Sequence, residues 1–293
     1  MKPSTATTAA LAQSELDDIR ALIEQRSAIL FEPSRERFFS GRVREFLEEK
    51  GLGTGADLFR RIQSSGVEYE ELLERLLTQE TSFFRYPAVF EALEKTVLPS
   101  VHQRKLWQNP RKLRIWSAGC STGEEPYSIA ITLCEALKLA DAWDIEILAT
   151  DISRKALRLA QRAAYSERSL LNVTPSLLDS YFEKTKQGFH VKPRIKRLVS
   201  FAQMNLAEAP YVGKVDCIFC MNVLMYFSPA RRLAALQLFH EALEPGGYFL
   251  LGHAETLSDV SLDFEPMVQG DCRIYRKPAS KETRRGAAAA ETL

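Results

Sequence analysis

The spacing of apolar residues changes after the first third of the chain, and this change limits the possible folds more than any other feature. Before residue 98, apolar residues recur every three or four positions, as in Leu16, Ile19, Leu22 and Ile23. This is the spacing of an amphipathic helix. No strand pattern interrupts the region. We therefore predict an all-helical domain over residues 15–98, preceded by a disordered terminus over residues 1–14.

From residue 113 onward, short apolar runs alternate with helical patterns. A polar, basic segment over residues 99–112 separates the two regions and is predicted to be a linker. The expected strands cover residues 113–116, 145–149, 215–220 and 248–251, and a short strand around Ile274; the expected helices cover residues 127–139, 153–163 and 229–243. Strands and helices that alternate in this way form βαβ units and a parallel sheet. We predict an α/β, Rossmann-like domain over residues 113–278, followed by a disordered tail over residues 279–293.

One segment breaks this alternation. Residues 184–199 hold short apolar pairs separated by Pro193, which is the pattern of a small β-hairpin appended to the main sheet. Residues 184–197 carry six Lys or Arg and no Asp or Glu. We therefore expect a small, inserted β-subdomain with a positive potential.

Composition excludes several classes of protein. A net charge of +1 over 293 residues argues against a dedicated nucleic-acid binder. No apolar run approaches the roughly 20 residues of a transmembrane helix, and the amino-terminal residues lack the apolar stretch of a secretory signal. Five cysteines in a chain of this length indicate reduced thiols. The composition predicts a cytoplasmic, globular protein without membrane insertion.

The only metal-like spacing in the sequence is Cys217-Ile-Phe-Cys220. It falls within a predicted buried strand, where residues three apart point to opposite faces. No second pair and no nearby His completes a set of four ligands. We expect structural thiols and no metal site.

The first predicted strand ends in a glycine turn, Gly119-Cys-Ser-Thr-Gly123. The G-x-G-x-x-G dinucleotide fingerprint and the P-loop G-K-[ST] are both absent. Glu124 and Glu125 open the next helix and would repel a pyrophosphate, but they suit a ligand with cationic groups. Asp151 ends the second strand, where an acid can accept hydrogen bonds from ribose hydroxyls. Taken one at a time, these features are also consistent with a plain turn, a helix-dipole effect and a helix cap; together they fit S-adenosylmethionine.

Five ordered motifs resemble the CheR-type chemotaxis receptor methyltransferases, which are protein-glutamate O-methyltransferases. The motifs are WSAGCSTGEEPYS over residues 116–128, T-S-F-F-R over 81–85, A-T-D-I over 149–152, N-V-L-M-Y-F over 222–227 with N-L at 205–206, and G-H-A-E over 252–255. The resemblance covers residues 15–278. It implies a Rossmann-like class I methyltransferase sheet with an amino-terminal all-helical domain and a small inserted β-subdomain.

The resemblance also implies a role for each matching residue. The implied cofactor-binding set is Gln79, Thr81, Arg85, Gly119, Glu125, Asp151, Asn205, Leu206, Met221 and Asn222. Asp151 would hold the ribose, and Asn205 and Leu206 the adenine. Glu125 would lie near the methionine end, with Glu124 as the less favoured alternative.

The implied catalytic residues are Arg85 and Tyr226. Thr81 and Arg85 would come from the helical domain and close over the cofactor. Asn222 would lie beside the transferable methyl group, with Tyr226 one turn beyond. A glutamate side chain, with a reference pKa of about 4.3, is already ionised at neutral pH, so methyl transfer to it demands no general base.

The chain departs from the family pattern at three places. Gln79 replaces the usual Asn, and Met221 replaces the usual Arg, which removes a bidentate carboxylate binder. The segment around Gln187 is shorter than in members that bind a receptor's carboxyl-terminal pentapeptide. We therefore expect a protein that acts without such a tether. We also expect a monomer.

The resemblance predicts methylation of glutamates on the cytoplasmic helices of chemoreceptors. Complementary positive charge for that acidic surface is expected on Arg35, Arg37, Arg42 and Arg44, and on the β-subdomain. Two alternatives remain open from sequence: a related methyltransferase acting on a different signalling protein, and a non-catalytic module that binds the cofactor or its product.

Overall fold

A computed structural model of the chain describes residues 11–108, 111–137, 142–208, 212–253, 255–258 and 260–279. The chain divides into two compact units. The helical unit contains the residues up to Thr78 together with Tyr226–Ser228, and the sheet unit contains Gln79–Met225 and the residues from Pro229 onward. The predictions of disorder for residues 1–14 and 279–293 fall largely on residues outside the described ranges, but the first helix begins at Gln13, within the first of them.

The helical unit confirms the helical periodicity of the first third of the chain. Its elements are α1 (Gln13–Ser27), the 3₁₀ turn η1 (Pro33–Arg35), α2 (Glu36–Glu49), α3 (Gly55–Ser64) and α4 (Gly66–Leu76). Ile23, Phe39 and Ile62 are completely buried in its core. Thr54 caps α3 by accepting a hydrogen bond from the Asp57 N–H at 3.1 Å. The prediction of an all-helical first domain is therefore confirmed, although the sequence analysis did not single out α3.

The boundary between the units lies earlier than the sequence suggested. The helices α5 (Pro87–Ala92), η2 (Leu93–Val97, a π-helical turn) and α6 (Leu98–Arg104) belong to the sheet unit. Phe90, Leu93 and Val97 pack in the same core as the central strands. The units therefore divide after Thr78 rather than at residue 98, and the predicted linker contains most of α6 and the start of the first strand.

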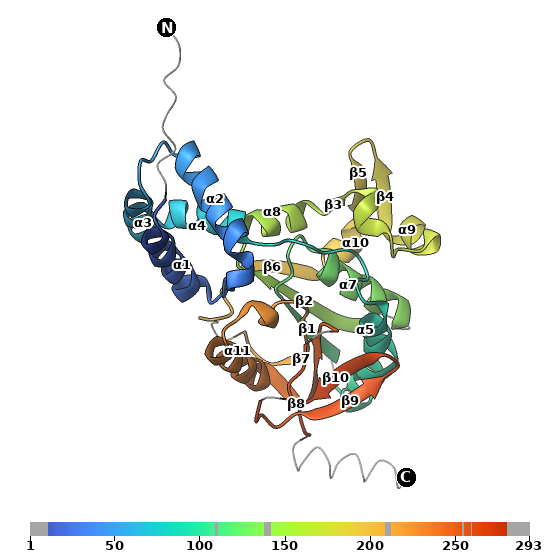
Figure 1. Cartoon of the computed structure of the whole chain (residues 1–293). Helices are drawn as coiled ribbons and strands as arrows, with labels where there is room; N and C mark the ends of the chain where they lie inside the picture. The colour runs from blue at the N-terminus through green and yellow to red at the C-terminus, as the bar shows by residue number, and fades with distance from the viewer. Residues whose placement is uncertain are drawn as a thin grey trace. The chain divides into compact units, whose positions relative to one another are not determined.

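A seven-stranded sheet forms the centre of the sheet unit (Figure 1). Its strands are β1 (Arg111–Ala118), β2 (Trp143–Asp151), β6 (Val199–Gln203), β7 (Val215–Cys220), β8 (Leu243–Leu251), β9 (Glu265–Gln269) and β10 (Cys272–Arg276). Their order is β6-β2-β1-β7-β8-β10-β9. The first five are parallel, and β10 and β9 are antiparallel. The predicted Rossmann-like α/β class is confirmed.

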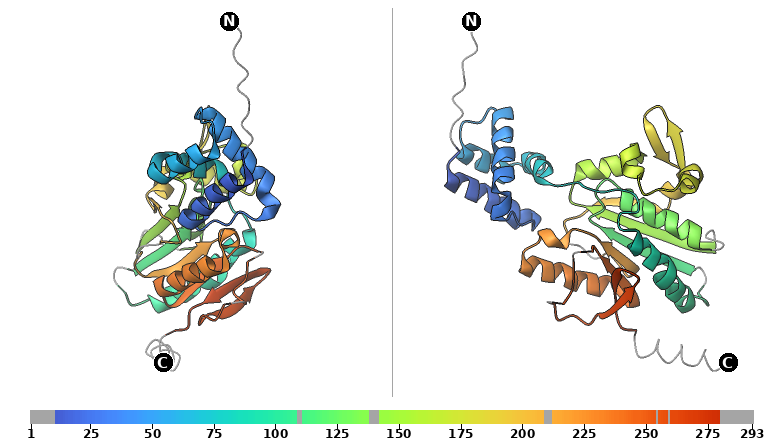
Figure 2. Two further views of the ribbon diagram at one scale, coloured as in Figure 1. Left: turned by 60° about the vertical axis from the view of Figure 1, so that its left-hand side comes forward. Right: turned by 45° about the vertical axis from the view of Figure 1, so that its right-hand side comes forward.

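Helices cover both faces of this sheet (Figure 2). On one face, α5 and α7 (Glu124–Ala136) share a core with Leu113 and Ile115 of β1, and α8 (Arg154–Arg162) packs beside β2 and β6. On the other face, Phe239 of α11 (Pro229–Ala242) meets the ring of Trp116 edge-on at 5.1 Å. Successive β1 side chains therefore serve opposite layers, as the period of two requires.

A separate three-stranded sheet replaces the simple hairpin expected at residues 184–199. Its strands are β3 (Ala164–Tyr165), β4 (Phe182–Thr185) and β5 (Gly188–Val191), in the order β3-β5-β4, and the helices around it are η4 (Glu167–Leu170), α9 (Pro175–Tyr181) and α10 (Pro193–Lys196). Pro193 opens α10, because its fixed φ suits the first helical turn. Val199 then begins β6 of the main sheet. The β-subdomain exists, but it starts and ends earlier than predicted.

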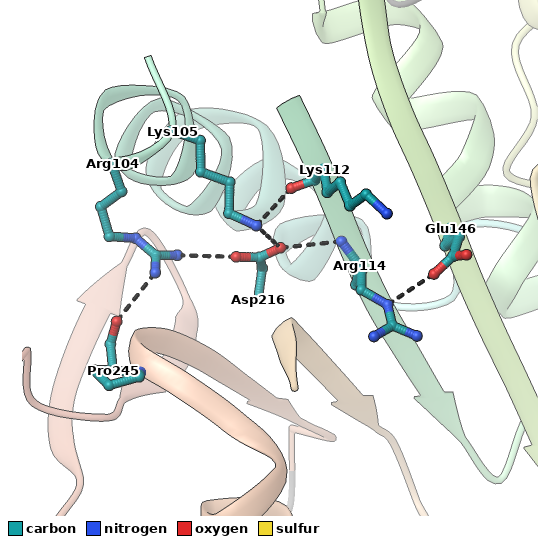
Figure 3. Close-up of polar contacts among 7 residues, drawn as sticks. All are labelled: Arg104, Lys105, Lys112, Arg114, Glu146, Asp216 and Pro245. Carbon is teal, nitrogen blue, oxygen red and sulfur yellow. Dashed lines mark hydrogen bonds and ion pairs between the residues drawn. The ribbon is translucent and has the colours of Figure 1, made fainter. Parts of the chain in front are cut away.

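A buried acid holds together the amino-terminal edge of the parallel strands (Figure 3). The Asp216 carboxylate, at the start of β7, accepts hydrogen bonds from Lys105 Nζ at 2.6 Å and from the Arg114 N–H at 3.0 Å. Arg104 approaches its other oxygen at 3.5 Å. Asp216 is 1% exposed, and the side chains of Arg104 and Lys105 are 16% and 12% exposed. These ion pairs attach α6 to the sheet.

We expect Asp216→Ala to lower the free energy of unfolding by about 3–5 kcal/mol, because it leaves two part-buried cations without their counter-ion. The matched control is Glu146→Ala, which removes the exposed Arg114–Glu146 pair at 2.7 Å and should cost under about 1 kcal/mol. Denaturant unfolding followed by tryptophan fluorescence measures both, since Trp107, Trp116 and Trp143 all lie in the sheet unit. Equal losses for the two variants would contradict this interpretation.

Candidate active site

The turn after β1 is fastened to the end of β2. The N–H groups of Gly119 and Cys120 both donate to the Thr150 carbonyl oxygen, at 2.8 and 2.9 Å. Gly119 has φ +85°, and a Cβ added there would lie 2.3 Å from a methyl carbon of Val223. Only glycine satisfies both the left-handed backbone and this close approach. The carboxyl ends of β1, β2 and β7 are thereby drawn together at the point where the strand order reverses.

Asp151 joins the same turn through its side chain. One carboxylate oxygen accepts the Ser121 N–H at 2.8 Å, and the other accepts the Ser153 N–H at 2.9 Å. Ser153 caps α8 by accepting the Ala156 N–H at 2.9 Å, and Gln79 Nε2 donates to the Ser153 hydroxyl at 3.0 Å. A carboxylate oxygen can accept more than one hydrogen bond. Asp151 is therefore oriented by the backbone and retains the capacity to accept from ribose hydroxyls.

The two glutamates at the start of α7 have different surroundings. Glu124 is 3% exposed, and its oxygens accept hydrogen bonds from the hydroxyls of Thr122 at 2.6 Å and Ser169 at 3.2 Å. Glu125 is less buried and accepts one hydrogen bond, from the Ser117 hydroxyl at 2.6 Å. The geometry favours Glu125 as the residue available to a ligand and gives Glu124 a structural role.

Burial, with a smaller contribution from the Glu255 carboxylate, raises the pKa of Glu125 to about 7. The Ser117 hydroxyl and the Arg85 guanidinium limit this rise. Burial also raises the pKa of Glu124. A carboxyl group with a pKa near neutrality, in a site that also holds an arginine, is characteristic of a functional position.

The segment with Gln79, Thr81 and Arg85 belongs to the sheet unit, so the expectation that Thr81 and Arg85 come from the helical domain is corrected. The reason is packing. Phe83 is completely buried, with its ring 4.8 Å from that of Tyr165, and the Phe84 N–H donates to the Ser128 hydroxyl on α7 at 2.9 Å.

Arg85 lies between two residues with left-handed backbone. Phe84 has φ +50° and Tyr86 has φ +59°, a conformation that is rare for aromatic residues and is retained where surrounding structure enforces it. The Arg85 guanidinium donates to the Glu80 carbonyl oxygen at 2.6 Å and lies 5.2 Å from the Tyr86 ring. It is also close enough to Glu125 to affect the pKa of that carboxyl group. Arg85 and Glu125 are thus electrostatically coupled.

Two buried polar atoms at this edge have no hydrogen-bond partner. They are Ser121 Oγ, in the turn after β1, and Asn222 Oδ1, directly after β7. Both residues have left-handed backbone, with φ +48° and +60°. Buried polar atoms are rarely left without a partner unless a ligand or water completes them. Ser121 was not predicted from sequence as a site residue.

The remaining cofactor-binding candidates also lie in the sheet unit. Leu206 and Met221 are each 8% exposed. Asn205 Oδ1 accepts the Ala207 N–H at 3.0 Å and so closes the turn after β6. Met221 directly follows β7. It places an apolar side chain where the family pattern has a guanidinium.

Tyr226 belongs to the helical unit. The 3₁₀ turn η5 (Leu224–Tyr226) carries the chain into it. There, the Tyr226 carbonyl oxygen accepts the Leu30 N–H at 2.6 Å, and Arg35 lies 5.8 Å from the centre of the Tyr226 ring. The structure therefore assigns the two predicted catalytic residues to different compact units.

The residues of this edge fit S-adenosylmethionine. They provide an oriented acid for a ribose, carboxylates for cationic groups, and two unpartnered polar atoms. In the described stretches, no three His, Cys, Asp or Glu side chains gather as a metal site would require. Cys217 and Cys220 are buried in β7, and burial raises the pKa of both thiols. None of the described helices has the length and apolar character of a membrane span.

Comparison with known proteins gives one family for both parts of the chain. The SAM-binding domain model of the CheR methyltransferases matches residues 79–272, and the all-alpha domain model of the same family matches residues 14–77. Chemotaxis protein methyltransferase 2 of Vibrio cholerae is 37% identical over 87% of this chain and 89% of its own length. Chemotaxis protein methyltransferase 1 of Pseudomonas aeruginosa is 33% identical over 90% of this chain and 98% of its own length.

Among solved structures, magnesium protoporphyrin IX methyltransferase from Synechocystis, with bound SAM, aligns at 18% identity over 77% of this chain and 91% of that chain. Its TM-score is 0.38.

The raised pKa of Glu125 predicts how stability depends on pH. The folded protein keeps a proton on Glu125 up to about pH 7, whereas the unfolded chain releases it near pH 4.5. The wild-type free energy of unfolding should therefore fall as pH rises from about 4.5 to 7 and then level off, with a contribution of at most about 3 kcal/mol. Glu125→Gln removes this titration.

Denaturant unfolding at about pH 4.5, 5.5, 6.5 and 7.5 tests this expectation. The stability of Glu125→Gln relative to wild type should increase across the series. A difference between the two proteins that stays constant with pH would contradict it.

Proposed function

The chain belongs to the CheR methyltransferase family, and on that premise we propose that it methylates glutamate carboxylates on the cytoplasmic helices of chemoreceptors. It is an S-adenosylmethionine-dependent methyltransferase of chemotaxis. The observation that carries the proposal is the placement of the Arg85 guanidinium, which donates to the Glu80 carbonyl oxygen at 2.6 Å and lowers the pKa of Glu125 electrostatically. That arrangement offers a fixed cation for a substrate carboxylate beside an acid for the cofactor's cationic end.

Each cofactor-facing residue has a role in this proposal. Asp151 accepts from the ribose hydroxyls, and Asn205 and Leu206 contact the adenine. Glu125 faces the methionine ammonium. The support for these roles is that two backbone N–H groups hold Asp151 and that the Ser117 hydroxyl orients Glu125 through a hydrogen bond.

The remaining cofactor-binding residues shape the backbone around the cofactor; they include Gln79, Thr81 and Gly119. Gln79 acts through Ser153, to which it donates a hydrogen bond, so its longer side chain still reaches the cap of α8. Met221 contributes apolar surface, and Asn222 and Ser121 direct their unpartnered oxygens toward the ligand.

The bound cofactor supplies the methyl group on a cationic sulfur. The chain's own task is to orient and partly desolvate a substrate carboxylate, which is already ionised at neutral pH. Arg85 orients it through its guanidinium, and Tyr226 is the second candidate through its hydroxyl. Orientation of this kind can supply roughly 7–11 kcal/mol of the barrier. No proton has to be removed, so no general base is assigned.

The receptor surface is proposed to bind basic groups on α2 and on the small sheet. Arg37 and Arg44 are exposed on α2, whereas Arg42 pairs with Glu45 at 2.8 Å. Arg35 is engaged within the helical unit, because it donates to the Thr78 hydroxyl at 2.9 Å and lies over the Phe38 ring. We therefore exclude Arg35 from the docking surface.

The short connection between β4 and β5 supports tether-independent action. β4 ends at Thr185 and β5 begins at Gly188, which leaves little loop to hold a peptide. We propose that the enzyme works as a cytoplasmic monomer and binds receptors without a carboxyl-terminal pentapeptide.

The cofactor roles predict the behaviour of Asp151 variants. Asp151→Ala should weaken binding of S-adenosylhomocysteine by about 10–100-fold, since it removes hydrogen bonds to an ionised acceptor. Asp151→Asn, which keeps one acceptor oxygen, should lose less. Titration calorimetry measures the affinities, and Glu94→Gln, on an exposed part of η2, is the control. Unchanged affinity in Asp151→Ala would refute the ribose role.

The substrate role of Arg85 predicts a loss of turnover. Arg85→Ala should lower the rate of methyl transfer to receptor-containing membranes by about 100-fold, because it removes a preorganised charge. Arg85→Lys keeps the charge but not the bidentate geometry and should recover part of the loss. Cofactor binding without transfer by wild type would favour the non-catalytic module, and transfer to another protein would favour the alternative methyltransferase.

Tether independence predicts equal rates on two receptor forms. Removing the last five residues of a receptor should change the rate of methyl transfer by less than about twofold, because no pentapeptide contact adds to the effective concentration. The measurement is radiolabel incorporation into matched membranes with intact and truncated receptor. A drop of tenfold or more on truncation would show that a tether is used.

A further inference from the structure

A single carboxylate gathers three backbone N–H groups at the carboxyl edge of the sheet. Glu255 Oε2 accepts from Asn222 at 2.8 Å and from Gly252 at 3.1 Å, and Oε1 accepts from Met225 at 3.2 Å. The donors come from the segments that follow β7 and β8. Glu255 ends the G-H-A-E motif, to which the proposed function assigns no role.

The first of these donors belongs to a strained residue. Asn222 has φ +60°, and non-glycine residues in this region persist where the surroundings enforce it. Its side-chain oxygen is buried without a hydrogen-bond partner. The hydrogen bond from the Asn222 backbone N–H to Glu255 thus holds a residue whose side-chain oxygen has no partner.

The packing of Gly252 shows how closely these segments approach. A Cβ at Gly252 would lie 2.9 Å from Glu255 Oε2, 3.1 Å from the Asn222 N and 3.2 Å from Asn222 Nδ2. Contacts this short leave no room for a side chain between the carboxylate and Asn222. Glycine at 252 is therefore needed for the arrangement.

We infer that Glu255 is a positioning residue that fixes the strained backbone of Asn222, so that the Asn222 amide faces the bound cofactor. The inference rests on the proposed function, in which Asn222 contacts S-adenosylmethionine. A carboxylate suits this task because it only accepts, and its two oxygens offer about four lone-pair sites. Glutamine would place an N–H₂ group against one of the three donors.

A double-mutant cycle separates positioning from a general structural role. Glu255→Gln is made in wild type and in Asn222→Ala, and binding of S-adenosylhomocysteine is measured by titration calorimetry. In wild type we expect about tenfold weaker binding, as for the loss of one charge-assisted hydrogen bond. In Asn222→Ala, the same change should cost less than about twofold, because no amide remains to be positioned.

Gly252→Ala tests the same arrangement by displacing the Glu255 carboxylate without removing it. The added methyl group should push the Glu255 carboxylate away from Asn222 and weaken binding about as much as Glu255→Gln does in wild type, again with little effect in Asn222→Ala. Glu94→Gln is the matched control for the loss of a carboxylate. Tryptophan fluorescence at each step establishes that the sheet unit is folded.

The possible outcomes distinguish a failure of the proposed function from a failure of the positioning role of Glu255. Wild type that fails to bind S-adenosylhomocysteine overturns the proposed function and this inference with it. Wild-type binding with equal losses in both backgrounds, or with no loss on Glu255→Gln, overturns the inference alone. A loss confined to chains that retain Asn222 supports it.

Discussion

The hydrogen bonds that fasten the end of β1 to the end of β2 are the interaction on which the rest of the site depends. The Thr150 carbonyl oxygen accepts two N–H groups from the glycine turn, and the Asp151 carboxylate accepts a third from Ser121. These bonds hold non-helical backbone against the tips of a parallel sheet, where the strand order reverses. They also fix the ribose candidate before any ligand arrives, which lowers the entropic cost of binding.

The two edges of the sheet use buried carboxylates for opposite purposes. At the amino edge, Asp216 is matched by Lys105 and Arg104, and its charge stabilises the fold. At the carboxyl edge, burial leaves Glu125 with a pKa of about 7, so its ionised form is unfavourable until a cation arrives. The left-handed backbone of Ser121 and Asn222 at the same edge also costs free energy of folding. The proposed ligand site is therefore a place where the fold is less stable than it could be.

Sequence reasoning predicted the parts of this structure that local pattern determines. Helical spacing predicted the all-helical character of the first domain but did not single out α3, and the glycine turn and Asp151 were located at the correct strand ends. It misplaced the unit boundary, because Phe90 and Val97 show the same spacing whether they pack on helices or on a sheet. It missed β6 as part of the main sheet, since this edge strand has alternating, mostly exposed side chains. It also gave Glu255 no role, because that residue's partners are backbone groups up to 33 residues away. The roles of the individual cofactor-facing residues stay predictions.

In the proposed reaction, this edge of the sheet presents a methyl group to a side-chain carboxylate. The most direct measurement is the alkali lability of the methyl group transferred to receptor. Carboxyl methyl esters release volatile methanol in mild base, whereas methylated amines do not. The account predicts that nearly all of the transferred radiolabel becomes volatile. Label that survives base treatment on the receptor would contradict it.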